Sequence, residues 1–232
     1  MMSLIKKAGI AAGFVALASS SLTFLPNTAS AQLGGLGKLA GGGGVASGNI
    51  ESDVKTFVEK SNAINDNLAT ASSLMVIAYA SEEKRAQVQS QFDAMKKSTD
   101  PKETTALQQK MITSNLAEMN SQTKSADLAE TTKALSAEKK QKLAQGVANF
   151  LIGALQAKDL VPTGQAVVQS ATANPMSIPK VLPIKDALPV LASAIESAAK
   201  TMPTFVSALK GANIKVDEVT SSSKPVSIKS LD

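Results

Sequence analysis

The chain has 232 residues, a formal net charge of +5 and no cysteine, so it can form one domain whose stability comes from apolar burial without disulfides. Arg85 is the only arginine, and aromatic residues make up 3% of the chain. Nucleic-acid binding typically uses clustered arginines and stacking rings, so we expect no nucleic-acid partner despite the positive charge.

Residues 1–31 have the three parts of a secretory signal peptide. Lys6 and Lys7 form the positive end, an apolar run follows, and Ala29-Ser30-Ala31 supplies the small residues that signal peptidase accepts. A membrane anchor would need about 20 consecutive apolar residues, whereas three serines at 19–21 interrupt this run. We therefore expect cleavage near Ala31-Gln32 and a periplasmic or secreted protein with no transmembrane span.

Residues 32–48 are rich in glycine and predict a flexible linker. Within this segment, residues 35–40 match the G-x-G-x-x-G/A dinucleotide pattern. That pattern needs a buried strand before it, and the signal cleavage site lies where the strand should be. Leu33, Leu36 and Leu39 could contact a membrane or a partner, but so many glycines resist helix formation, and we favour a plain tether.

The first helix is predicted over residues 50–80. Asn49 is a suitable N-cap, and Glu51 and Asp53 place negative charge in the first turn. An apolar stripe at alternating steps of three and four indicates a long helix packing along a neighbour; its members are Ile50, Val54, Phe57, Ser61, Ile64, Leu68, Ala71, Met75 and Ala78. We interpret Ser61, its one polar member, as a small residue that permits close approach.

Three shorter helices are predicted between residues 81 and 135. The first follows Ser81 and reaches about Lys97. Asp100-Pro101 restarts the chain as a second helix, because an acidic cap and a proline at the first helical position are typical of a helix start. That helix fades near Lys124, and residues 126–135 form the third.

Ser136 caps the next predicted helix, which is apolar nearly all round from Gly146 to Leu155. A helix of this kind lies at the buried centre of a bundle. Asn149 is the only polar residue of the stretch. We interpret it as a residue that sets the register of packing, in preference to a ligand contact.

Two glycines on this central helix raise the question of a groove. Gly146 and Gly153 are seven residues apart and share a face, so they indicate either close backbone approach or an open groove. Methionines elsewhere would provide an adaptable lining for an apolar ligand, although ordinary core filling is the simpler interpretation. The candidate groove residues are Gly146, Asn149, Gly153, Met75 and Met202.

Prolines dominate the sequence after residue 160. Val161-Pro162 and Asn174-Pro175 are predicted to bracket a short helix. Prolines at positions 175, 179 and 183 then predict a stiff connector without regular helix.

A second apolar stripe predicts a helix from about residue 185 to 210; its members are Leu188, Leu191, Ile195, Ala198, Met202, Phe205 and Leu209. Pro189 falls in the first turn of that helix, and Pro203 is predicted to kink or restart it. Lys210-Gly211 is a suitable end. Residues 214–232 alternate weakly and could form a small hairpin, but we favour a mobile tail.

The sequence offers little for catalysis. The absence of histidine and cysteine removes Ser–His–Asp and Cys–His nucleophiles and the usual zinc and di-iron ligands. Asn65-Asp66-Asn67 lacks the spacing and glycine of a calcium loop. The S-x-x-K spacing of serine–lysine hydrolases recurs along the chain without its companion motifs, which indicates a serine- and lysine-rich helical surface. We expect no catalytic residue, no metal and no cofactor.

The sequence therefore predicts an all-α, mostly antiparallel bundle of five to seven helices over residues 49–213. A signal peptide over 1–31 and a linker over 32–48 precede it, and an extended or disordered tail over 214–232 follows. Two functions stay open. The protein binds an envelope protein partner or serves as a scaffold, or it carries an apolar ligand such as a lipid between its helices. The oligomeric state is open.

Overall fold

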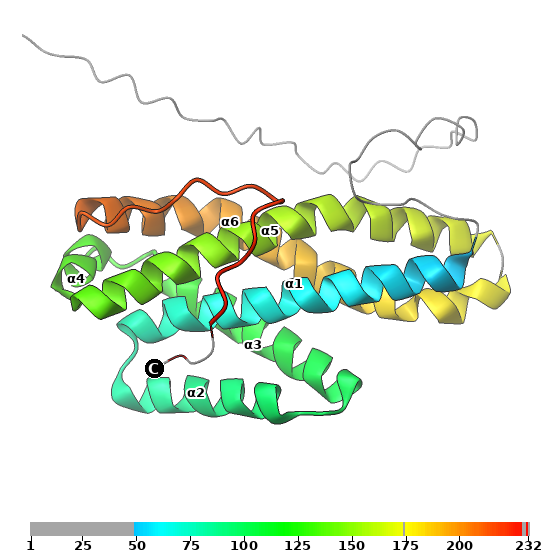
Figure 1. The fold of residues 1–232 in the computed structure, drawn as a ribbon, viewed down its shortest axis with the longest axis horizontal. Coiled ribbons are helices and arrows are strands. Elements are labelled where there is room, and N and C mark those ends of the chain that lie inside the picture. Colours follow the sequence, from blue (N-terminus) through cyan, green and yellow to red (C-terminus); the bar gives the residue numbers. More distant parts are fainter. Residues whose placement is uncertain (1–48, 174, 229–230, 232) are drawn as a thin grey trace, which may run out of the picture. The chain divides into compact units, whose positions relative to one another are not determined.

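A computed structural model describes residues 49–173, 175–228 and 231, and in these ranges the chain is all-α with no strand. The predicted bundle of five to seven helices is confirmed (Figure 1). The signal peptide and the glycine-rich linker lie outside the described residues. The elements are α1 (Ile50–Tyr79), α2 (Glu82–Lys97), α3 (Pro101–Gln122), α4 (Leu128–Ala134), α5 (Ala137–Thr172), the 3-10 helix η2 (Pro175–Val181) and α6 (Leu182–Gly211).

Four helices begin at side-chain caps, and the sequence predicted three of them, at Asn49, Asp100 and Ser136. Asn49 Oδ1 accepts from the backbone N–H of Glu51 at 3.1 Å, and Asp100 caps α3, with a proline at its first position. Ser81 and Ser136 cap α2 and α5 through their hydroxyls. Each cap satisfies an N–H that has no partner within its helix. The starts of these helices can therefore be predicted from the local sequence.

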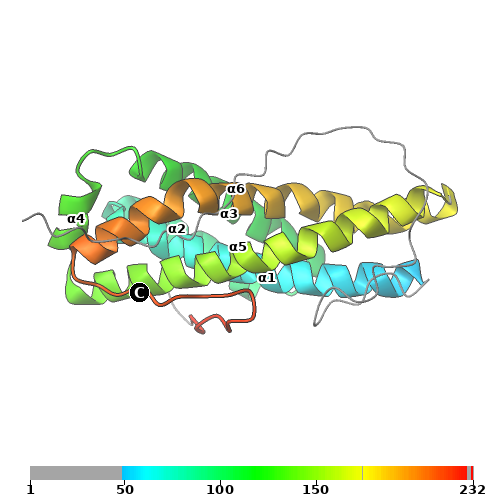
Figure 2. The same ribbon diagram turned by 90° about the horizontal axis from the view of Figure 1, so that it is seen from above.

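The core is built by α1, α5 and α6. Met75 of α1 meets Gly146 of α5, and Phe57 meets Gly164, so the two helices run antiparallel. Tyr79 at the end of α1 lies beside Phe205 near the end of α6, and Glu51 at the start of α1 pairs with Lys180 just before α6. Those two helices are therefore parallel, with α5 opposite to both (Figures 1 and 2).

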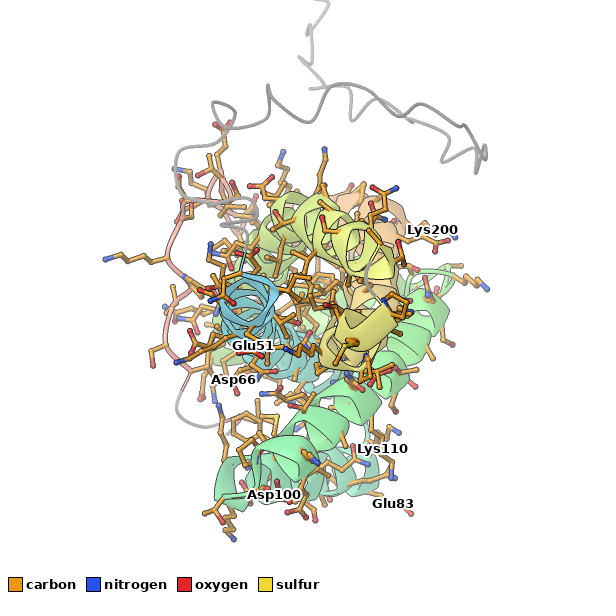
Figure 3. The ribbon with its side chains drawn as sticks, turned by 90° about the vertical axis from the view of Figure 1, so that its right-hand side faces the viewer. Glu51, Asp66, Glu83, Asp100, Lys110 and Lys200 are labelled. Atoms are coloured by element: carbon orange, nitrogen blue, oxygen red, sulfur yellow. The ribbon has the colours of Figure 1, made fainter. Side chains whose placement is uncertain are left out.

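The remaining helices pack around this core. α2 folds back along α1 and packs mainly against α1 and α3. α3 in turn packs against both α1 and α6. The short α4 contacts α6. Viewed along the bundle, the charged side chains of Glu83, Asp100 and Lys200 lie at its periphery (Figure 3), while both predicted apolar stripes are buried over most of their length. None of the described helices is long and apolar enough to cross a bilayer.

The proline predictions were wrong in three respects: the helix end at Pro162, the connector without regular helix, and the place of Pro189 in a first turn. α5 continues through Pro162 to Thr172 instead of ending there, and α6 runs through Pro203 without a break. The expected irregular connector is the 3-10 helix η2, and α6 starts at Leu182, so Pro189 lies beyond its first turn.

The helices continue through these prolines because all three in-helix prolines are exposed. Each proline removes the hydrogen bond to the carbonyl four residues earlier. The residues at those earlier positions, 158, 185 and 199, are also exposed, so water can solvate the freed carbonyls.

Residues 212–228 follow α6 as a segment without helix or strand, so the hairpin alternative is not seen in the described residues. The turn after α6 contains Asn213 with φ 61°, the left-handed conformation that asparagine tolerates. The segment then runs over α5, turns, and crosses toward α1 (Figure 1, red). We call residues 214–231 the tail.

Candidate binding surfaces

The two glycines of the candidate groove lie against α1. A Cβ added at Gly146 would meet the Ala71 carbonyl oxygen and Met75 Cγ, each at 3.0 Å, and one at Gly153 would meet Leu68 Cδ2 at 2.8 Å. Of the two interpretations that the sequence left open, these contacts fit close backbone approach. Atoms of α1 occupy the space in which a groove over either glycine would have to lie.

The structure brings only part of the candidate set together. Met75 touches the Gly146 position, whereas Gly153 packs on Leu68 farther along α1. Met202 is buried on α6 at 2% exposure. Both methionines lie within the main hydrophobic core, where they pack as core side chains.

A third glycine belongs to the same close approach, and the sequence reading missed it. A Cβ at Gly164 would lie 2.4 Å from Phe57 Cε2. The signal was present, because Gly146, Gly153 and Gly164 follow one another at steps of seven and eleven, which keep one face of a helix. Because the helix was predicted to end at Pro162, Gly164 was not placed on the same helix as the other two glycines.

Asn149 contacts the tail. Its Oδ1 accepts from the Val226 N–H at 2.9 Å, and its Nδ2 donates to the Val226 carbonyl at 2.7 Å. The Asn149 carbonyl in turn accepts from Asn67 Nδ2 of α1 at 2.9 Å. Asn149 is 1% exposed, so this amide is a buried two-point clamp on the backbone of one residue.

A polar seam joins α1 and α3, and nothing in the sequence reading anticipated it. Asn115 Nδ2 of α3 donates to Ser72 Oγ at 3.1 Å and to Ser73 Oγ at 2.9 Å. Thr105 Oγ1 donates to Asn62 Oδ1 at 3.4 Å. The contacts of Thr105 with Asn62 and of Asn115 with Ser72 span the same 43 residues, so α1 and α3 run parallel and in register.

The same offset places Asn65 opposite Gln108. The two residues are 0% and 4% exposed. Neither amide atom of Asn65 has a hydrogen-bond partner among the described residues, and the same is true of Gln108 Oε1 and Ser61 Oγ. Buried polar atoms of this kind cost free energy, so this layer weakens the seam between α1 and α3.

A cavity of about 340 Å³ lies where α1 ends, α2 begins and α5 begins. We call it the corner pocket. Its apolar wall is formed by Leu74, Ile77, Ala78, Ala86 and Leu231, the last being a tail residue that is 2% exposed.

The rim of the corner pocket is basic. It carries Arg85, Lys139 and Lys142 against one acid, Glu138. Arg85 Nε donates to the carbonyls of Ile77 and Ala80, both at 3.1 Å, so its guanidinium closes the C-terminal end of α1. Lys142 pairs with Glu138 at 3.1 Å, which leaves a net positive rim.

The end of the bundle that carries η2 exposes apolar side chains. Met176 is 84% exposed, Leu182 50% and Ile178 38%. All three lie within seven residues, in a segment that also contains Pro175, Pro179 and Pro183. We call Met176, Ile178 and Leu182 the apolar tip.

A second cavity, of about 310 Å³, lies between α3 and α6. Ile112, Leu116 and Val190 contribute apolar surface, while Glu196 and Lys200 provide charge. Those two charged groups pair with one another, and the pairing lowers the pKa of Glu196 through the hydrogen bond and the charge of Lys200.

The described side chains offer no assembled catalytic or metal centre. No group of three or more potential metal-ligating residues comes together in the part of the chain that the structure describes. Two of the S-x-x-K pairs are helix starts, since Ser81 and Ser136 accept from the backbone N–H of Lys84 and Lys139. Their spacing thus follows from N-capping geometry.

Comparison with protein-family models, curated proteins and solved structures found no match to the chain in any of the three.

Proposed function

We propose that this chain is an exported, non-enzymatic helical-bundle protein of the cell envelope that binds a protein partner or acts as a scaffold. The observation that supports it is the apolar tip. Three large apolar side chains are exposed within seven residues at one end of the bundle, and exposed apolar surface is a feature of interaction sites. The prolines restrict the backbone that presents them, which lowers the entropy lost when a partner orders the tip.

Partner binding can be tested by site-specific photocrosslinking at the tip. A photoreactive residue at Ile178 is expected to crosslink one defined envelope protein in cells, whereas the same residue at Lys158, exposed on the solvent side of α5, is not. Changing Met176 and Leu182 together to serine should remove the crosslink without lowering the free energy of unfolding. Recovery of the chain crosslinked only to itself, or of no protein, would contradict the proposal.

The matched control uses a second exposed aliphatic residue. Val226 is 52% exposed, close to the 50% of Leu182, but it lies on the tail, away from the tip. Val226→Ser should leave the crosslink at Ile178 intact. This comparison separates a specific tip from a general effect of removing exposed apolar surface.

A carrier of an apolar ligand is the second candidate, and the cavity between α3 and α6 favours it. Its volume of about 310 Å³ falls at the lower end of the range for small-molecule sites, about 300–1,000 Å³. Against it, the glycine face of α5 is filled by α1. Organic extraction of protein purified from the envelope tests this candidate: lipid at stoichiometric amounts supports a carrier, and extraction of none removes it.

Export is tested separately. If residues 1–31 are cleaved as the sequence indicates, the protein recovered from the periplasm or medium begins at Gln32 by intact mass. Ala29→Leu and Ala31→Leu together should leave an uncleaved precursor, because the bulky side chains do not suit a small-residue cleavage site. A mature mass that retains residues 1–31 would contradict the assignment.

A further inference from the structure

We infer that the surface of α5 around Asn149, together with the corner pocket, is a binding site for an extended peptide segment of the partner protein, occupied in this structure by the chain's own tail. The inference rests on the proposed function, since it requires a protein partner. The apolar tip lies beside the start of α1 and the corner pocket at its end, so a partner bound at both reaches along the bundle. The tail then acts as a built-in competitor that the partner displaces.

The first support is the geometry at Asn149. A buried amide that accepts from the N–H and donates to the C=O of one residue, Val226, satisfies the same groups that a neighbouring strand would satisfy. The Asn149 amide therefore binds the main-chain groups of this residue and not its side chain. Val226 is itself 52% exposed, so its side chain adds little contact and another residue fits equally well there.

The second support is the corner pocket, five residues farther along the tail. Leu231 enters it and is 2% exposed, yet about 340 Å³ stays unfilled beside it. A site shaped only for its own tail would be packed, as protein interiors are. The unfilled volume therefore leaves room for an aliphatic or aromatic side chain larger than leucine.

The third support is the sparse contact that the bundle makes with the tail in the stretch before Val226. Gln156 Nε2 donates to the Ser221 carbonyl at 3.2 Å, and most residues from 217 to 227 are exposed. The tail is held by the Asn149 clamp, by Leu231 and by packing of Ile228 on the core, and its tethering raises its effective concentration at the site. A partner segment with better contacts can replace it without unfolding the bundle.

These features define the chemistry of the partner segment. It is extended at the position of Val226 and carries a large apolar side chain five residues later. The net positive rim formed by Arg85, Lys139 and Lys142 favours an acidic residue next to that side chain. In the tail's own sequence Asp232 follows Leu231, which agrees with that preference.

A binding assay with the full chain and a free peptide tests the site. Val226→Pro loosens the chain's own tail, because proline accepts an extended backbone but lacks the N–H that Asn149 binds. A fluorescent peptide of residues 214–232 should bind this variant about ten-fold more tightly than it binds wild type, the change expected from one lost hydrogen bond to a buried acceptor. Val226→Ala keeps the N–H and should behave as wild type.

Controls in the peptide leave the receptor untouched. Against the Val226→Pro chain, the peptide with alanine at 226 should bind as the native peptide does. Peptides with proline at 226, or with aspartate at 231, should bind at least about ten-fold more weakly. Absence of native peptide binding to the Val226→Pro chain, or equal binding of the proline peptide, overturns the inference.

The identity of the occupant is tested next. A protein captured by crosslinking at Ile178 should displace the labelled peptide from the Val226→Pro chain, and a captured protein that leaves the peptide bound overturns its assignment to this site. A concentration-dependent dimer that wild type forms and Val226→Pro does not would assign the site to a second copy instead. The peptide assay contains no partner, so its failure and failure of the crosslink are separate results.

Discussion

Single glycines set how closely α1 and α5 approach. At Gly164 the Cβ position lies 2.4 Å from Phe57 Cε2, whereas at Gly211, the last residue of α6, no atom outside its neighbours lies within 4 Å. The two glycines thus form a matched pair. One is required by packing, and the other is a helical residue in open space.

Gly164→Ala should lower the free energy of unfolding by about 1–3 kcal/mol, because the buried Phe57 ring has to shift to admit a methyl group. Gly211→Ala should leave it unchanged or raise it by less than about 1 kcal/mol, the gain from helix propensity. Urea unfolding followed by circular dichroism measures both. Equal effects at the two positions would show that the contact with Phe57 does not constrain α5.

Tyr79 is the one tyrosine of a chain without tryptophan, and burial raises the pKa of its phenol above the usual 10. Its hydroxyl lies 2.8 Å from Thr132 Oγ1. The Thr132 hydroxyl itself donates to the Leu128 carbonyl, so Tyr79 is the donor in that pair. Ionisation would remove this donated hydrogen bond as well as bury a charge.

The raised pKa makes stability fall at high pH. The neutral phenol contributes its full stabilisation below pH 10, the unfolded value, and this contribution is lost as the pH rises through the folded pKa. Absorbance of the phenolate follows Tyr79 alone, and it should titrate at higher pH in the native protein than in denaturant. Coincident titration curves would mean that the ring is solvated.

Among the helices, those with side-chain caps were predictable and those crossed by proline were not. Asn49, Ser81, Asp100 and Ser136 act within one turn of chain, so local sequence carries the information. Whether a helix continues past Pro162 depends on neighbours distant in sequence, since Gly164 beyond it packs on Phe57 of α1. The spacing of Gly164 from Gly146 and Gly153 marks a shared helix face, but the sequence does not identify Phe57 as the residue packed on it.

For the candidate groove, the sequence predicted only that its two glycines share one face of a helix. The spacing of Gly146 and Gly153 indicated either a close approach or a groove, and α1 lies against both positions. The bonding of Asn149 was not predictable, because its partner Val226 lies 77 residues away in a segment whose pattern is only weakly alternating. The alignment of α1 with α3 was equally hidden, since small polar residues such as Ser72 and Asn115 are common on solvated surfaces.

The seam between α1 and α3 gives a prediction about buried polar pairs. Replacing Asn65 and Gln108 together by leucine removes three amide atoms without partners and should raise the free energy of unfolding by about 1–3 kcal/mol. Asn115→Leu should lower it by about 1–2 kcal/mol, because Ser72 and Ser73 lose a donor. Urea denaturation distinguishes the two signs, and a destabilised double variant would indicate that Asn65 has partners such as bound water.

For the molecule as a whole, charge contributes little to stability. The ion pairs between described residues are largely exposed, for example Lys96 with Asp66 at 2.8 Å and Lys55 with Glu59 at 4.0 Å. Exposed pairs of this kind are screened by salt and add little. The thermal midpoint should therefore change little between low and physiological ionic strength, and a marked fall in differential scanning calorimetry would contradict this.

The antiparallel packing of α1 on α5 also sets an order of events while the chain is made. Phe57 meets Gly164 only after α2, α3 and α4 have been synthesised, and local pairs such as α1 with α2 form long before that. If residues 1–31 direct export, the interval before α5 can pack on α1 falls during passage across the membrane. The apolar stripe of α1 is uncovered in that interval.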